Sequence, residues 1–251
     1  MSAKIAVLLC AHNAEKYIKE AVDSILAQSC EDFEFFIVEN GSTDRTWEII
    51  QSCKDSRIKA FQTPVEQLSF NLNFGMMQTE AEYIARMDAD DIARPQRLAR
   101  QAAFLGANPD VHVVGSAFEI FGENLNKRRI ILMPQSDSQI RKKIAFRFCF
   151  CHPTVMFRRK TILAVGGYQG SRFCQDVDLW LRLSRDKSIK FANLPDVLLD
   201  YRIHSAQAKG DRECFIINAS QLFREALVQK SPRLFAGFIV SLFKILRGSR
   251  S

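Results

Sequence analysis

The chain has 251 residues, of which 47% are hydrophobic and 25% charged, a composition that excludes a fibrous or largely disordered protein. Lys and Arg number 35 against 28 Asp and Glu, and the net charge of +7 favours an anionic partner such as a nucleotide, a nucleic acid or a membrane surface. The seven cysteines form no C-x-x-C pair and indicate free thiols in a reducing cytosol, and no apolar run reaches the roughly 20 residues that cross a bilayer.

The first half of the chain alternates predicted strands and helices. In chain order we predict a strand over 4–10, a helix that Asn13 caps and that runs to Leu26, a strand over 33–39, a helix over 44–54, a strand over 58–62, a helix over 67–79, a strand over 82–87 and a helix that opens at Pro95 and runs to about Leu105. This order predicts an α/β fold with a mainly parallel, doubly wound sheet.

The second half is less regular. Two successive strands are predicted over 111–122, a helix over 137–148, a strand over 153–159, a short helix over 160–167, a helix over 175–187, strands over 189–193 and 197–202, and a helix over 213–230. No internal repeat and no low-complexity linker interrupts the chain, so we expect a single mixed domain.

Three of the predicted strands in the first half are followed by polar residues. These clusters are "AHN" at 11–13, "ENGSTD" at 39–44 and "DADD" at 88–91. Ligands of parallel α/β sheets bind beyond the carboxyl ends of the strands, so the three clusters are expected to meet at one edge.

The cluster "DADD" places Asp88, Asp90 and Asp91 within four residues. Carboxylates this close repel one another unless a cation lies between them, and hard divalent cations such as Mg²⁺ or Mn²⁺ prefer carboxylate oxygen. The alternative is a solvated acidic turn in which Asp91 caps the next helix. In "ENGSTD", Glu39 is either part of an ordinary strand–helix turn or an acceptor for the base or ribose of a nucleotide.

Several stretches together resemble the inverting glycosyltransferases of family 2. They are the segment from "AVLLCAHNAEKY" to "VENGSTDRT", then "YIARMDADD", "HPTVMFRR", "GGY" and "QDVDLWLRL", in the order of that family and within residues 4–205. The resemblance implies a GT-A fold, which is a Rossmann-like mixed sheet flanked by helices. It also implies a nucleotide-diphosphate sugar as donor, most commonly a UDP-sugar, and transfer to an acceptor hydroxyl.

The resemblance also implies roles for particular residues. Residues 1–110 would bind the nucleotide sugar, and residues 111–230 would carry the acceptor side and the catalytic base. The resemblance implies Ala11, Asn13 and Glu39 in the pocket for the base. His152 would lie on the acceptor side. Asp88 would lie near the ribose and the metal, Asp90 would be a ligand of Mn²⁺ or Mg²⁺, and His204 would lie at the metal or the diphosphate. A late histidine of this kind is, without the resemblance, equally interpretable as structural.

The block "QDVDLW" contains the residue that the resemblance implies as general base, Asp176. Gln175 stands where the family usually has Glu, which puts any role of that Glu in acceptor binding in doubt. The alternative is that Asp176 only caps the following helix. Displacement assisted by this base would invert the anomeric carbon.

The C-terminal tail, residues 231–251, is basic and apolar. Its segment 234–246 is too short to span a membrane but places most apolar residues on one helical stripe, accompanied by Arg233, Lys244, Arg247 and Arg250. A peripheral contact with an anionic inner leaflet fits this pattern. A helix packed on the domain or on a second subunit is the alternative.

The resulting prediction is a cytoplasmic glycosyltransferase, peripheral at the inner face of the plasma membrane. Its acceptor would be a glycan or lipid-linked glycan in surface-polysaccharide synthesis. The alternatives are a catalytically inactive relative that only binds sugar nucleotide, an aspartate-nucleophile phosphatase, and a module that binds nucleic acid or an anionic surface. No recognised nucleic-acid motif occurs, and the phosphatase would leave "ENGSTD" and "QDVDLW" unexplained, so we expect no nucleic-acid partner.

Overall fold

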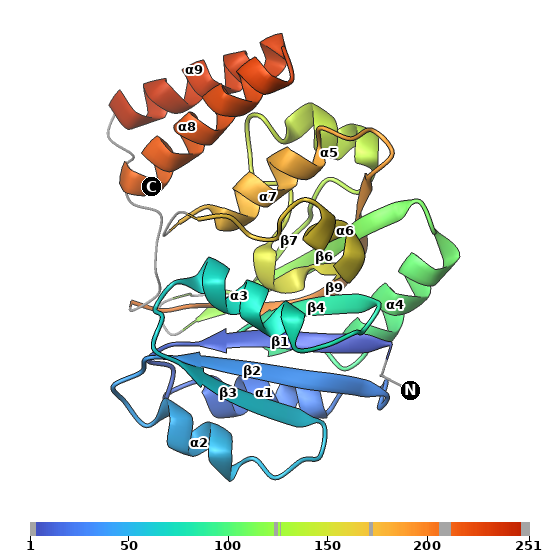
Figure 1. Cartoon of the computed structure of the whole chain (residues 1–251), viewed down its shortest axis with the longest axis vertical. Coiled ribbons are helices and arrows are strands. Elements are labelled where there is room, and N and C mark those ends of the chain that lie inside the picture. The colour runs from blue at the N-terminus through green and yellow to red at the C-terminus, as the bar shows by residue number, and fades with distance from the viewer. Residues whose placement is uncertain (1–3, 123–124, 126, 171–172, 206–211, 247–251) are drawn as a thin grey trace.

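The computed structural model describes residues 4–122, 125, 127–170, 173–205 and 212–246. A mixed sheet with the strand order β3-β2-β1-β4-β8-β6-β9-β5 forms its centre, and β7 pairs with β6 outside this path (Figure 1). The strands are β1 (Ile5–Ala11), β2 (Phe33–Asn40), β3 (Ile58–Thr63), β4 (Tyr83–Asp88), β5 (Ile92–Ala93), β6 (Val111–Gly122), β7 (Arg129–Ile131), β8 (Met156–Arg158) and β9 (Lys190–Ile203).

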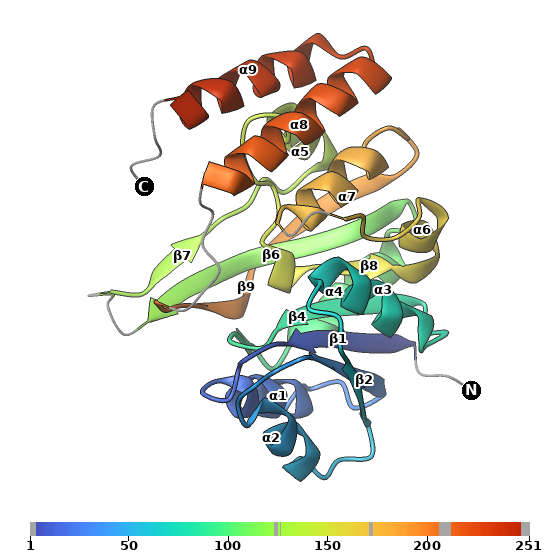
Figure 2. The ribbon, with the colours of Figure 1, turned by 60° about the vertical axis from the view of Figure 1, so that its left-hand side comes forward.

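Helices cover both faces of this sheet (Figures 1 and 2). They are α1 (Ile18–Leu26), α2 (Thr46–Ser52), α3 (Leu68–Met77), α4 (Arg97–Ala107), α5 (Asp137–Lys143), the 3₁₀ turn η1 (His152–Thr154), α6 (Arg159–Ala164), α7 (Gln175–Leu183), α8 (Arg212–Val228) and α9 (Pro232–Leu246). No helix within the described ranges is both long and apolar enough to cross a membrane.

The first half of the sheet is parallel, as predicted. β1 pairs in parallel with β2 and β4, and β2 pairs with β3. Strands buried on both faces read as continuous apolar runs, and β1 has this character from Ile5 to Leu9. One face packs against α1, α2 and α4, and the other against α3, α6 and α7.

In the second half, β8 runs opposite to the strands of the first half, whereas β6 and β9 run in the same direction as those strands. β8 is antiparallel to both β4 and β6, and β6 then runs parallel to β9. The two strands predicted over 111–122 are one continuous strand, β6, and the two predicted over 189–202 are likewise one strand, β9. The helix predicted over 137–148 ends already at Lys143.

The two C-terminal helices share a small core with α7 and the segment after α5. Leu234 of α9 is buried with Leu222 and Ala226 of α8, Leu181 of α7 and Ala145. Figures 1 and 2 show α8 and α9 lying side by side at one end of the molecule, with α9 outermost. The fold is thus a single α/β domain with a helical C-terminus, as the sequence predicted.

Candidate active site

The carboxyl ends of three central strands lie in register. Cys10 of β1 is opposite Asp88 of β4, and Ala11 of β1 is opposite Glu39 of β2. The clusters that follow these strands therefore begin at the same edge of the sheet, as predicted from the order of the elements.

The loops after β1 and β2 are hydrogen-bonded to each other. The Thr43 backbone N–H donates to Asn13 Oδ1 at 2.9 Å, and the Asn13 N–H donates to Ser42 Oγ at 3.0 Å. Asn13 has a φ of +48°, in the left-handed region where Asn is tolerated better than most residues. The prediction that Asn13 caps α1 is wrong, because that helix begins at Ile18 with Tyr17 at its N-cap.

Glu39 stabilises the turn after β2. Its Oε1 accepts the Ser42 N–H at 2.5 Å, its Oε2 accepts Gln62 Nε2 at 3.1 Å, and the residue is only 2% exposed. Ala11 beside it is fully buried. The turn interpretation of "ENGSTD" is therefore correct, and a role of Ala11, Asn13 and Glu39 in a base pocket stays a prediction.

Asp88, Asp90 and Asp91 form a compact acidic cluster directly after β4. One carboxylate oxygen from each lies within 4.8 Å of those of the other two. Asp88 forms an ion pair with Arg86, and Asp90 Oδ2 lies 3.0 Å from His204 Nε2. Burial, followed by the charge of Asp88, raises the pKa of Asp90.

Asp91 differs from the other two acids because it is fully buried. Its Oδ1 accepts the Arg202 N–H at 2.8 Å, and its Oδ2 has no hydrogen-bond partner among the described residues. Burial and the charges of Asp88 and Asp90 raise its pKa well above the ordinary value. Asp91 does not cap the next helix, which begins only at Arg97; it attaches the DADD turn to β9.

This donor set fits a hard divalent cation. Three neighbouring carboxylates repel one another, only Asp88 of the three is ion-paired with an arginine, and one oxygen of Asp91 is buried without a hydrogen-bond partner among the described residues. Asp88 and Asp90 are each partly exposed and so accessible to an ion, and His204 lies beside Asp90. Oxygen ligands with one imidazole suit Mn²⁺ or Mg²⁺.

Asp176 lies in the first turn of α7, which begins after Cys174 in a left-handed conformation with φ +57°. Burial raises the pKa of its carboxyl, while the Val177 N–H and the positive charge of Arg86 oppose that rise; Asp88 adds to it. Asp176 therefore shares the electrostatic surroundings of the acidic cluster, although 88 residues separate it from Asp88 in the chain.

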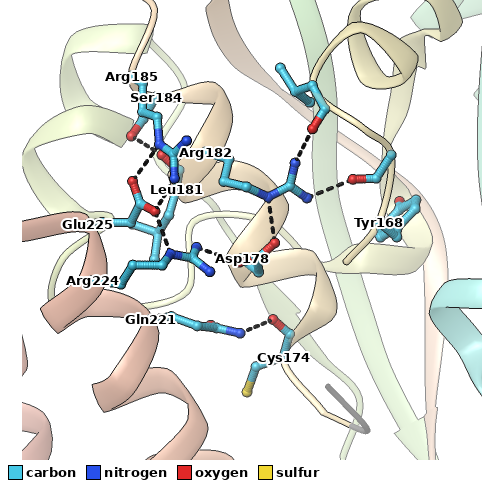
Figure 3. A network of polar contacts seen from close by, with 12 residues as sticks. Tyr168, Cys174, Asp178, Leu181, Arg182, Ser184, Arg185, Gln221, Arg224 and Glu225 are labelled. Carbon is cyan, nitrogen blue, oxygen red and sulfur yellow. Dashed lines mark hydrogen bonds and ion pairs between the residues drawn. The ribbon is translucent and has the colours of Figure 1, made fainter. Parts of the chain in front are cut away.

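The other residues of the block "QDVDLW" are structural. Asp178 is buried and accepts from Arg182 Nε at 2.6 Å and from Arg224 of α8 at 2.5 Å (Figure 3). Arg182 also donates to the carbonyls of Val165 and Gly167, which fixes the GGY turn to α7. Gln175 is buried, whereas Asp176 is partly accessible.

His152, expected on the acceptor side, lies in the 3₁₀ turn η1. Its Nε2 is 2.8 Å from Tyr168 Oη, and its ring packs against the rings of Tyr168 and Trp180. Burial, followed by the charge of Arg86, lowers its pKa well below the ordinary value, which favours the neutral imidazole. A contact with an acceptor stays a prediction.

No role was assigned to Arg86 or Arg202 from the sequence. Arg86 is 3% exposed, and its Nε and Nη1 have no hydrogen-bond partner among the described residues. Arg202 Nε donates to the Asp90 carbonyl at 2.8 Å, and its guanidinium lies 4.5 Å from the centre of the Tyr17 ring. The signal for Arg86 was present in "IARMDADD": a basic residue inside an otherwise buried strand needs a carboxylate beside it.

Known proteins resemble this chain over most of its length. The family model described as glycosyl transferase family 2 matches residues 6–166. The O-antigen biosynthesis glycosyltransferase WbnJ of Escherichia coli is 34% identical, over 96% of each chain. The UDP-Gal:alpha-D-GlcNAc-diphosphoundecaprenol beta-1,3-galactosyltransferase of Escherichia coli is 31% identical over 82% of this chain and 76% of its own.

Solved structures share the fold at low sequence identity. The structure of S. aureus TarS 1–349 in complex with UDP-GlcNAc has a TM-score of 0.73 and 19% identity, over 96% of this chain and 73% of its own. The mannosyltransferase PcManGT from Pyrobaculum calidifontis, in complex with GDP-Man and Mn²⁺, has a TM-score of 0.65 and 17% identity, over 98% of this chain and 70% of its own.

Proposed function

The chain belongs to glycosyltransferase family 2, and from this premise we propose that it transfers a sugar from a UDP-sugar to an acceptor hydroxyl with inversion. The observation that carries the proposal is the shared electrostatic environment of Asp176 and the acidic cluster at the carboxyl ends of the strands. A carboxylate of raised pKa that interacts electrostatically with Asp88 of a cation-binding set supports a reaction centre to which both contribute.

The donor side of the proposal rests on Asp88, Asp90 and His204. These residues would hold Mn²⁺ or Mg²⁺, and the ion would neutralise negative charge on the diphosphate leaving group. Ala11, Asn13 and Glu39 would form the pocket for the base, where the interlocked loops after β1 and β2 fix the backbone. UDP is favoured because a 31%-identical relative is named for UDP-Gal and a structural neighbour is in complex with UDP-GlcNAc.

Asp176 is the general base of the proposed reaction. Its carboxylate takes the proton of the acceptor hydroxyl as that oxygen forms a bond to the anomeric carbon. The bond from this carbon to the diphosphate oxygen breaks on the opposite side, and the nucleoside diphosphate leaves with the electron pair. Attack opposite the leaving group inverts the anomeric centre.

The acceptor that we propose is a glycan or lipid-linked glycan in bacterial polysaccharide synthesis. Two relatives support this class: one is named for O-antigen biosynthesis, and the other for GlcNAc-diphosphoundecaprenol. Such an acceptor places the enzyme in the cytoplasm next to the inner leaflet, and a contact through 234–246 would hold it there.

Asp176→Asn tests the proposal. Without the base, transfer should fall by about 10²- to 10⁴-fold, while binding of UDP-sugar should be unchanged. The matched control is Asp23→Asn, since Asp23 is an exposed carboxylate on α1. Asp176→Asn turning over at the wild-type rate would refute the base assignment. Tight donor binding by the wild type without transfer to any acceptor would favour the alternative that the chain is a catalytically inactive relative. That alternative is suggested by Gln175, which stands where the family usually has Glu.

A further inference from the structure

The outer face of α9 is unusually apolar for a surface helix. Leu234, Gly237 and Ser241 form its buried stripe. The residues opposite are large and hydrophobic yet accessible: Phe235 is 46% exposed, Phe243 57% and Leu246 79%. The helix contains no acidic residue, so little on its outer side favours water.

The apolar face of α9 continues onto α8, and the segment after α5, which packs against the buried stripe of α9, also exposes apolar side chains. Phe223 of α8 is 40% exposed, and its ring centre lies 5.0 Å from that of Phe238 on α9. Phe146 and Phe148, which follow α5, are 40% and 61% exposed. A Cβ on Gly237 would lie 2.2 Å from the Ala145 carbonyl oxygen, so α9 rests directly on this segment.

Basic charge is concentrated in the same two parts of the chain. Residues 226–251 contain five Lys or Arg and no acid, and residues 142–151 contain three and no acid. The chain as a whole has a net charge of +7, so everything outside these two segments carries a net charge of −1. Lys142, Lys143, Arg147 and Lys244 are all exposed.

We propose that the outer faces of α8 and α9 and the segment 142–148, together called the basic apolar pole, form one docking surface for an anionic lipid bilayer. Exposed Phe and Leu side chains can insert at the boundary of headgroups and acyl chains, and Lys and Arg beside them attract anionic headgroups. A second copy of the chain fits less well, because a symmetric contact would place the same basic residues opposite one another.

The pole is joined by ion pairs to the helix that carries Asp176. Arg224 of α8 contacts Asp178, Glu225 of α8 contacts Arg185, and Gln221 Nε2 donates to the Cys174 carbonyl at 3.1 Å (Figure 3). Docking would thus fix the orientation of α7 relative to the bilayer and present Asp176 to an acceptor held there. This consequence alone rests on the proposed function; the docking itself does not.

Vesicle flotation of the full chain tests the docking. Vesicles of phosphatidylcholine alone are compared with vesicles that contain phosphatidylglycerol, at low and high salt. We expect binding to the anionic vesicles only, weakened by salt. Two double variants, Phe235→Ser with Phe243→Ser and Lys142→Glu with Lys143→Glu, should each bind at least tenfold more weakly.

The matched controls lie away from the pole. Met77→Ser changes an exposed apolar residue on α3, and Lys54→Glu changes an exposed lysine after α2; both should bind vesicles as the wild type does. Circular dichroism checks that every variant is folded. Transfer to a water-soluble acceptor should be equal in all of them, so a failure of docking is distinguishable from a failure of the proposed reaction.

Two outcomes would overturn the proposal. The first is flotation that is the same for neutral and anionic vesicles, or that the two double variants leave unchanged. The second is a dimer, detected by light scattering, that Phe235→Ser with Phe243→Ser dissociates while vesicle binding is absent. That result would assign the pole to a second copy of the chain.

Discussion

Arg86 is a buried cation whose charge acts on two carboxylates of the candidate site, Asp88 and Asp176. It forms an ion pair with Asp88, and its positive charge opposes the rise in the pKa of Asp176 that burial causes. A general base acts only when ionised, so activity should be lost as the pH falls through the pKa of Asp176. Because that pKa is raised, the acid limb should lie above the range of an ordinary Asp.

Replacement of Arg86 tests this electrostatic role. Arg86→Met should raise the pKa of Asp176 further and move the acid limb of kcat/KM to higher pH, whereas Arg86→Lys, which keeps the charge, should stay nearer the wild type. The pH profile is the measurement, since a purely structural role would lower activity at every pH alike. Acid limbs of kcat/KM at the same pH in Arg86→Met and Arg86→Lys would contradict the prediction.

Replacement of Asp90 tests whether the acidic cluster binds a metal ion. Asp90→Asn removes a proposed ligand and should abolish the dependence of donor binding on Mn²⁺, with the fold retained because Asp90 is partly exposed. Treatment of the wild type with a chelator should reproduce the loss, and added Mn²⁺ should reverse it. Donor binding by Asp90→Asn that still depends on Mn²⁺ would exclude Asp90 as a ligand.

At the scale of elements, Gly237 allows α9 to pack closely against the backbone at Ala145. Alanine is the better helix former by about 1 kcal/mol, yet its Cβ would overlap the backbone carbonyl of Ala145. The overlap should cost more than propensity gains, so Gly237→Ala should expose α9 to faster amide hydrogen exchange. The control Ala236→Ser lies on the exposed side and should exchange as the wild type does. Unchanged exchange in Gly237→Ala would show that α9 can shift without cost.

The elements of the second half show where sequence reasoning failed. Two strands were predicted over 111–122 and two over 189–202, but Gly115 and Pro195 each lie within one long strand. A Cβ at Gly115 would lie 2.1 Å from Asn193 Oδ1, so Gly serves close packing there. Between Leu194 and Val197, β9 shifts its register against β6, and this irregularity accommodates Pro195. A Gly or Pro inside a continuous strand can be told from one at a strand end only when the neighbouring strand is known.

At the scale of the whole molecule, the first half was predictable because β1, β2 and β3 are each followed by a turn and a helix. The meeting of "AHN", "ENGSTD" and "DADD" followed from the parallel order alone. The approach of Asp176 and His204 to these acids did not follow from that order. The sheet is no longer purely parallel after β4, because β8 is antiparallel to it, and His204 lies 114 residues after Asp90 in the chain. There only the family resemblance anticipated the grouping, and neither the order of the elements nor the resemblance pointed to the buried Arg86.

The central claim is that the acidic cluster and the interlocked loops bind a nucleoside diphosphate through a metal ion. Calorimetric titration with UDP, GDP, dTDP, CMP and ATP, each with and without Mn²⁺, tests it most directly. We predict tight binding of UDP that requires Mn²⁺ and is lost in Asp90→Asn. Binding of no nucleotide in the panel, or equal binding with and without Mn²⁺, would contradict the account.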